Sequence, residues 1–242
     1  MVDTERYVEN HLKYFIYLQM NNFNWSDPPS HTAFPVARAG YPFILTSAFA
    51  TAIFAILGLT LFALMGLVAT FFICYFFRDP DRVVPKSTGT VVSPADGKVI
   101  WVGSVDTGPC FQEAGIKVSI FMSIFNVHVN RIPYEGQVKR VRYHPGKFFS
   151  ANLDKASMHN EHNAVFIETE EGKHICVVQI AGLIARRIIS RLQEGDIVIR
   201  GQRYGLICFG SRLDVYLPSN TKLNVSVGDR VKAGTSVLGD LT

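Results

Sequence analysis

The hydrophobic pattern of the chain divides it into an uncharged stretch and a mixed one. Residues 41–77 contain no Asp, Glu, Lys or Arg, whereas residues from 79 onward have ordinary globular character. One continuous helix over this stretch would be about 55 Å long, whereas a helix that crosses a bilayer needs roughly 20 residues, or about 30 Å. Because Gly58 and Gly66 interrupt it, we predict two helices, residues 41–57 and 59–77, that form a membrane-associated hairpin.

Basic residues flank this stretch on both sides. Arg38 precedes it, and Arg78, Arg82 and Lys86 follow it, which favours a cytoplasmic position for both ends. A hairpin, spanning or shallow, satisfies that rule and a single pass does not. A helical hairpin buried in a soluble core is the alternative; a secretory signal peptide would start earlier and be shorter. Residues 1–35 are predicted to be a polar N-terminal extension, for which an interfacial helix is one option. Residues 36–78 are predicted to form the hairpin.

Short apolar runs alternate with turn residues beyond position 88, as is typical of strands. The predicted strands cover residues 90–92, 98–102, 116–121, 136–143, 164–168, 174–180, 197–200, 204–209 and 213–217. Residues 183–192 have apolar side chains at helical spacing and are predicted to form a helix. The glycine-punctuated residues 225–239 resemble the sandwiched barrel of lipoyl and biotinyl carriers, without their modifiable lysine. We therefore predict an α+β, β-rich fold with a sandwiched-barrel-like domain over residues 79–242.

The net charge of +4 lies entirely beyond residue 78, because residues 1–78 carry four basic and four acidic side chains. A basic domain beside a bilayer is attracted to anionic lipid. Nucleic acid is not expected as a partner, since no basic stripe has interleaved aromatic residues. The four cysteines are Cys74, Cys110, Cys176 and Cys208. They form no CxxC pair, so we expect neither a zinc site nor a disulfide framework, but reduced thiols facing the cytosol.

Candidate chemistry is confined to a few short segments. Asp96 lies in a turn, where a carboxylate often only bonds its own backbone, and His128 lies in an apolar run, where a core histidine is the alternative. His159 and His162 are spaced like metal ligands, but no further ligand is evident and no metal is predicted. The Gly210-Ser211 pair separates two predicted strands. It is either a tight turn or a peptide bond that the protein cuts in itself.

These segments belong to a set of motifs in a fixed order. The set comprises Tyr75-Phe-Phe-Arg-Asp-Pro-Asp-Arg82, Ser93-Pro-Ala-Asp-Gly-Lys98, Phe121-Met-Ser123, Asn126-Val-His-Val-Asn-Arg-Ile-Pro133, Pro145-Gly-Lys147, Asn160-Glu161, Ala181-Gly-Leu-Ile-Ala-Arg-Arg187 and Phe209-Gly-Ser-Arg212. In content and order it resembles the phosphatidylserine decarboxylase family, in the short form found in bacteria and archaea. The resemblance covers residues 36–242.

The resemblance implies a proenzyme that cleaves itself between Gly210 and Ser211. The Ser211 hydroxyl attacks the Gly210 carbonyl, and elimination and hydrolysis leave a pyruvoyl group on the chain of residues 211–242. This cofactor, with no metal, forms a Schiff base with the serine head group, and carbon dioxide and phosphatidylethanolamine are released. The implied partners are the phosphatidylserine-type lipid, the membrane surface and the two cleavage products themselves, as a heterodimer or a higher oligomer. The implied location is the cytoplasmic face of the cell membrane.

The family motifs also imply roles for side chains. His128 matches the acid/base histidine and Asp96 the acidic residue that orients it. Arg131 stands where the longer enzymes have a second histidine, which leaves His144 or His162 as further candidates. Candidate ligands of the lipid phosphate are Arg186, Arg187 and Arg212. A solvated face or a membrane-surface contact is the alternative for these arginines, and the sequence does not locate an oxyanion stabiliser.

Two other functions are compatible with parts of the pattern. The same head-group chemistry on an archaeal ether lipid would need the same motifs. A noncatalytic membrane-tethered barrel, acting as an adaptor or carrier, would explain the residues 225–239 that resemble a lipoyl domain. The complete set of catalytic motifs argues against the second function.

Overall fold

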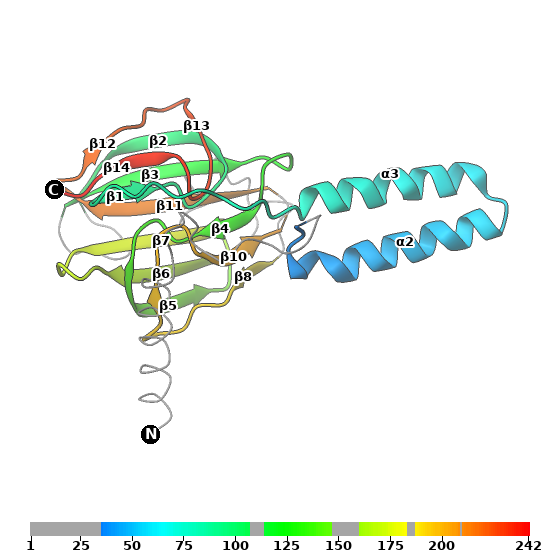
Figure 1. The fold of residues 1–242 in the computed structure, drawn as a ribbon, viewed down its shortest axis with the longest axis horizontal. Coiled ribbons are helices and arrows are strands. Elements are labelled where there is room, and N and C mark those ends of the chain that lie inside the picture. The colour runs from blue at the N-terminus through cyan, green and yellow to red at the C-terminus, as the bar shows by residue number, and fades with distance from the viewer. Residues whose placement is uncertain (1–34, 107–113, 147–159, 183–186, 209) are drawn as a thin grey trace, which may run out of the picture. The chain divides into compact units, whose positions relative to one another are not determined.

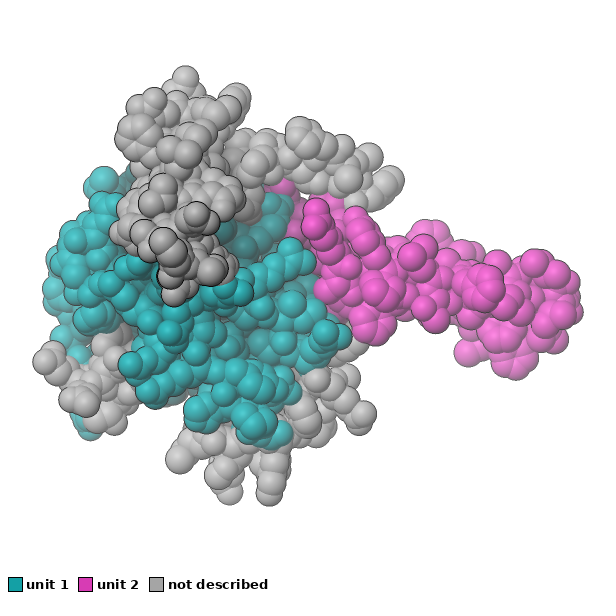
Figure 2. All heavy atoms as spheres, turned by 90° about the horizontal axis from the view of Figure 1, so that it is seen from below, with its two compact units in different colours: residues 1–28, 82–242 teal, residues 29–81 magenta. Residues whose placement is uncertain are grey.

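The computed structural model describes residues 35–106, 114–146, 160–182, 187–208 and 210–242 (Figure 1). It divides into two compact units, one of residues 29–81 and the other of the remaining chain (Figure 2).

The smaller unit is a helical hairpin. A 3-10 turn, η1 (Arg38–Gly40), leads into α2 (Tyr41–Ile56), and α3 (Thr60–Phe76) returns after a turn in which Gly58 has φ +72°. Ser47 Oγ lies 2.8 Å from Thr70 Oγ1 between the helices. A Cβ at Gly66 would come within 2.5 Å of Thr51 Oγ1, so glycine allows close helix packing there. The predicted helices at 41–57 and 59–77 are confirmed.

The hairpin carries its large apolar side chains on the outside. Relative exposures reach 84% at Ile56, 70% at Val68 and 69% at Phe49, and α2 buries no residue at all. Residues Arg38–Ile56 form one stretch of 19 residues that is long and apolar enough to cross a membrane, and α3 is a shorter apolar helix. This exposed apolar surface indicates association with a membrane and argues against a hairpin buried in a soluble core.

The larger unit is built from strands. They are β1 (Thr90–Val92), β2 (Gly97–Val105), β3 (Gly115–Met122), β4 (Val129–Arg131), β5 (Gly136–His144), β6 (His162–Glu168), β7 (His174–Ala181), β8 (Ile188–Ser190), β9 (Ile197–Val198), β10 (Arg203–Ile207), β11 (Ser211–Pro218), β12 (Lys222–Leu223), β13 (Arg230–Val231) and β14 (Val237–Asp240). The β-rich fold expected from the alternating pattern is confirmed.

One large sheet dominates this unit and curves as a half-barrel. Its strand order is β13-β2-β3-β11-β7-β6-β5-β9, and two three-stranded sheets, β1-β14-β12 and β4-β10-β8, accompany it (Figure 1). The main apolar core lines the inner face of the large sheet with residues such as Ile120, Val177 and Leu213. Since successive side chains of a strand point to opposite faces, β11 alternates between this core and the outer face.

Strand β11 is the central element of the large sheet. It pairs antiparallel with β3 from Ser211↔Met122 to Pro218↔Gly115, and with β7 from Ser211↔Ala181 to Tyr216↔Cys176. Its burial is nearly continuous from Ser211 to Leu217. A strand paired on both sides and buried on both faces is the least exposed type of element in a sheet.

Two expectations are wrong. Residues 188–190 of the predicted helix form β8, which pairs with β10 through Ile188↔Ile207; the β-branched Ile188 and Ile189 suit a strand, and a short apolar run does not distinguish the two structures. Residues 183–186 of that prediction lie outside the described residues. Cys176 is disulfide-bonded rather than reduced, whereas Cys74 and Cys208 are free.

Candidate active site

Ser211 begins the central strand with its side chain in the core. It is fully buried, and it lies opposite Met122 of β3 and Ala181 of β7, both core residues on the inner face. Its Oγ has no hydrogen-bond partner among the described residues. Buried hydroxyls nearly always have one, so an unpartnered hydroxyl in the middle of a sheet calls for a functional explanation.

Gly210 precedes it in a left-handed conformation, with φ +66°. A Cβ at this position would meet no heavy atom within 4 Å in the described part of the chain. The glycine is therefore required by its backbone angle rather than by lack of space, because other residues adopt this region at a cost. Phe209 lies outside the described residues.

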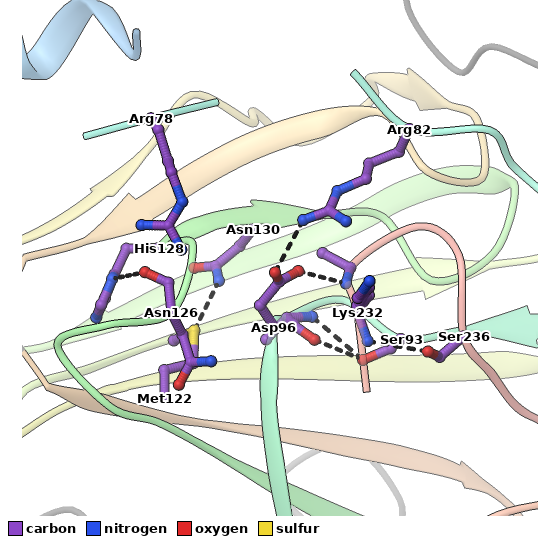
Figure 3. Close-up of polar contacts among 12 residues, drawn as sticks. Arg78, Arg82, Ser93, Asp96, Met122, Asn126, His128, Asn130, Lys232 and Ser236 are labelled. Atoms are coloured by element: carbon purple, nitrogen blue, oxygen red, sulfur yellow. Dashed lines mark hydrogen bonds and ion pairs between the residues drawn. The ribbon is translucent and has the colours of Figure 1, made fainter. Parts of the chain in front are cut away.

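His128 lies just before β4 and is buried. Its Nδ1 is 3.0 Å from the carbonyl oxygen of Asn126 (Figure 3). A carbonyl oxygen only accepts hydrogen bonds, so Nδ1 carries the proton in this contact and Nε2 is the basic nitrogen of the neutral ring. The turn that holds Asn126 is itself bonded, since Asn126 Oδ1 accepts from Ser123 N at 2.9 Å and from Ser123 Oγ at 2.8 Å.

Asp96 has partners other than His128 for each carboxylate oxygen. Oδ2 accepts from Arg82 Nη2 at 2.8 Å, and Oδ1 accepts from the backbone N–H of Ala233 at 2.7 Å (Figure 3). Figure 3 also separates the two side chains, with Asn130 drawn between His128 and Asp96. Asp96 therefore ties residue 233, near the C-terminus, to the turn before β2.

A network of buried amide side chains, which the sequence analysis did not identify, leads to Met122 opposite Ser211. Gln179 Nε2 donates to Asn130 Oδ1 at 2.8 Å, and Asn163 Nδ2 donates to Gln179 Oε1 at 3.2 Å. At its other end Asn130 Nδ2 lies 3.6 Å from the sulfur of Met122, the residue opposite Ser211. All three amides are buried. Asn130 thus connects the segment of His128 to the strand beside Ser211.

A missing side chain makes room for this network. Gly205 of β10 lies opposite Asn130 of β4, and a Cβ at Gly205 would come within 2.8 Å of Gln179 Nε2. Asn163 of β6 and Gln179 of β7 are amide side chains among mostly apolar residues, and this was the available sequence evidence for the network. Their mutual contacts depend on strand register, which a sequence does not define.

The arginine candidates lie in different environments. Arg187 is exposed, and its carbonyl oxygen accepts from the N–H of Cys208 at 3.1 Å, two residues before Gly210. Arg212 is buried on the face of β11 opposite Ser211, where its Nε and Nη2 donate to Asp214 at 2.6 and 2.9 Å. Its guanidinium is thus committed inside the protein and unsuited to a lipid phosphate. Arg186 lies outside the described residues.

The remaining sequence candidates do not converge on Ser211. His144 and His162 are partners across β5 and β6, with ring centroids 4.8 Å apart. Arg131, at the position of the expected second histidine, is buried and donates from Nη1 to the Gly201 carbonyl at 2.9 Å. His159 is outside the described residues, and among those described no group of three His, Cys, Asp or Glu residues could hold a metal ion.

Burial also controls two ionisable groups on β10 and just after it. Desolvation raises the pKa of the Tyr204 hydroxyl, so it stays protonated. Burial raises the pKa of the Cys208 thiol, and the positive charge of Arg187 opposes this rise. The negatively charged forms of Tyr204 and Cys208, which both precede Gly210 in the chain, are therefore disfavoured.

The chain is similar to proteins of one known family. The profile of the phosphatidylserine decarboxylase family matches residues 69–239. The chain is 51% identical over 211 residues to a phosphatidylserine decarboxylase proenzyme of Syntrophus aciditrophicus, covering 86% of this chain and 98% of that one. It is 51% identical over 203 residues to that of Nitratidesulfovibrio vulgaris, covering 84% and 93%. For the proenzyme of Nitrosomonas europaea the values are 47% over 206 residues, 85% and 94%.

The family match and these relatives show that the chain is a carboxy-lyase of a kind made as a proenzyme. More particularly, the chain belongs to the phosphatidylserine decarboxylase family, whose members use a pyruvoyl group.

Proposed function

We propose that the chain cuts its own Gly210–Ser211 bond and then decarboxylates phosphatidylserine to phosphatidylethanolamine. The observation that carries the proposal is the buried Ser211 hydroxyl without a partner among the described residues, directly after a left-handed glycine. This serine also occupies the Gly-Ser position of the family motif.

The residues present fit the pyruvoyl group. The Ser211 hydroxyl attacks the Gly210 carbonyl carbon, the peptide C–N bond breaks, and an ester and a free amine result. Removal of the Cα proton of residue 211 then expels the Gly210 carboxylate, and hydrolysis of the dehydroalanine releases ammonia and leaves the ketone. When bound to the substrate amine, the pyruvoyl group supplies an acceptor for the electron pair that remains as carbon dioxide departs.

We assign the proton transfers to Nε2 of His128. The Asn126 carbonyl holds the proton on Nδ1 and so keeps Nε2 basic. This replaces Asp96 as the group that orients the ring. The carboxylate of Asp96 instead anchors Arg82 and Ala233, and Asn130 links the histidine segment to Met122 beside Ser211.

The cut products are proposed to stay together as a heterodimer. The shorter chain, residues 211–242, would contain β11, which lies between β3 and β7 of the longer chain. Its β13 pairs with β2 and its β14 with β1. Its strands are thus held by the longer chain in two sheets. We propose the corresponding domain boundaries at residues 35 and 78 and the cut after residue 210.

We propose that Arg187 contacts the lipid phosphate, because it is exposed and lies next to Cys208 near the cut bond. Arg186 remains a second candidate from the sequence.

The apolar hairpin would keep the site at the level of the lipid head groups. The basic flanks favour the cytoplasmic face, whereas the Cys176 disulfide is more typical of an oxidising compartment. Labelling of exposed lysines such as Lys98 and Lys222 with a membrane-impermeant amine reagent, in right-side-out and inverted vesicles, decides between the two faces.

Intact mass and lipid extraction test the proposal together. The wild-type chain should give two fragments, residues 1–210 and 211–242, with the shorter one blocked by a pyruvoyl group. Defined phosphatidylserine vesicles should then yield phosphatidylethanolamine, and Ser211→Ala should stay uncut and inactive. Decarboxylation by Ser211→Ala would refute Ser211 as the source of the ketone. An archaeal serine ether lipid, offered in parallel, measures the preference for the lipid backbone.

A further inference from the structure

The first residues after the cut bond contain a buried ion pair on the outer face of the central strand. Arg212 and Asp214 are 1% and 0% exposed. Two nitrogens of the guanidinium meet the two carboxylate oxygens, Nε to Oδ1 at 2.6 Å and Nη2 to Oδ2 at 2.9 Å. Nη2 also donates to Ser119 Oγ of β3 at 3.1 Å. The pair therefore has two-point geometry and a third contact to the neighbouring strand.

The position of the pair along β11 is specific. Arg212 follows Ser211 directly, and Asp214 lies two residues further on the same face, opposite Ser119. Leu213, between them in sequence, and Ser211, just before Arg212, face the core instead. An i, i+2 ion pair forms only while its strand is extended, so the pair holds the backbone of residues 212–214 in the sheet.

Cutting the chain changes what this segment needs. Before the cut, residues 208–210 restrain the start of β11 covalently. After the cut, the strand begins with a free end in the middle of the sheet, and chain ends fray unless they are tied down. The fraying residues would be those that carry the reactive ketone, where a displacement of about 1 Å can cost about 100-fold in rate.

We propose that the Arg212–Asp214 pair is a positioning device that acts after self-cleavage, holding the new N-terminus of residues 211–242 in register against β3. Both partners belong to the shorter chain, and Ser119 is the contact to the longer one. The inference rests on the proposed self-cleavage. Arg212 and Asp214 are positioning residues and touch neither substrate nor the reacting atoms.

The test uses variants in which both charges are removed together, because a single unpaired buried charge would unfold the protein. Arg212→Met with Asp214→Leu should fold and cut, since the uncut chain restrains β11 covalently. The cut enzyme should lose about 100-fold in kcat with little change in KM. Amide hydrogen exchange of residues 213–215 should be faster in the cut double variant than in the cut wild type. In the uncut Ser211→Ala background, the double substitution should leave this exchange unchanged.

Two controls sharpen the result. Asn224→Ala removes an exposed 2.9 Å contact to Asp240 within the same short chain, far along from the cut, and should leave kcat and exchange at residues 213–215 unchanged. Arg212→Lys keeps the charge without the two-point geometry and should give an intermediate kcat. If the double variant fails to fold, Arg212→Lys alone decides, and wild-type kcat in it would overturn the proposal.

Three other results would overturn it as well. They are wild-type kcat in the cut double variant, exchange that rises equally in the uncut background, and a double variant that folds but stays uncut. A wild-type chain that remains at 242 residues would instead refute self-cleavage itself, and mass alone reveals that case.

Discussion

The side-chain amide of Gln179 donates a hydrogen bond to Oδ1 of Asn130 over 2.8 Å, and this bond joins the large sheet to the β4-β10-β8 sheet. Gln179→Leu fills the same space but leaves Asn130 Oδ1 and Asn163 Nδ2 buried without this partner. We expect a loss of about 3 kcal/mol in unfolding free energy, as for unsatisfied buried groups, measured by urea denaturation of the uncut Ser211→Ala chain. Gln137→Leu, at a partly exposed glutamine on β5, should cost far less.

A change at Gly210 should separate backbone strain from chemistry. Gly210→Ala and Gly172→Ala both place a methyl group where no heavy atom of the described residues lies within 4 Å, at φ +66° and +75°. Each should therefore destabilise the fold by a similar amount, about 1 kcal/mol. Only Gly210→Ala should slow the appearance of the 211–242 fragment in a time course of intact mass. Equal cutting rates in the two variants would show that the left-handed backbone conformation of Gly210 does not matter to self-cleavage.

His128 and His162 provide a matched pair of histidines. In each, Nδ1 contacts the backbone carbonyl two residues earlier, at 3.0 Å in His128 and 2.8 Å in His162. His128→Ala should reduce cutting or turnover by about 100-fold or more, as for the loss of an acid/base group. His162→Ala should leave both near the wild-type rate. A His128→Ala enzyme that cuts and turns over normally would move the acid/base role elsewhere.

Arg187 should be detectable through the thiol beside it. Because its charge opposes the rise in the pKa of Cys208 that burial causes, Arg187→Ala should raise this pKa further and lower the thiolate fraction. Alkylation of Cys208 at pH 8 should therefore be slower than in the wild type. Peptide mass spectrometry follows the reaction, with Cys74 as an internal reference. Arg191→Ala, at another exposed arginine nearby in sequence, should not change the rate.

Sequence analysis located the elements with a strong local pattern. The uncharged stretch predicted both helices of the hairpin, and the alternation beyond residue 88 predicted most of the strands. It failed at residues 188–190, where the apolar spacing suits a helix but pairing with β10 determines the structure. It also missed the disulfide of Cys176, since the spacing of isolated cysteines does not reveal which come together in space.

The site was predictable in part for the same reason. The family motifs named Ser211, Gly210 and His128, but a motif contains no contacts. The sequence therefore paired Asp96 with His128, whereas the carboxylate binds Arg82 and the Ala233 N–H. It likewise offered Arg212 to the lipid, although Asp214 and Ser119 occupy its guanidinium. The Asp96 contacts join segments far apart in sequence, and the Ser119 contact depends on the pairing of β3 with β11, so residue types alone do not specify them.

Because β11 lies between β3 and β7, the stability of the cut protein depends on how its sheet was assembled before the cut. The uncut chain can reach this topology because its last 32 residues are tethered to the rest while the sheet assembles. Once the bond is cut, the same sheet would have to form from two separate molecules that must find each other. The mature enzyme would then be protected by the height of its unfolding barrier rather than by a reversible equilibrium, and heating it past that barrier would inactivate it permanently.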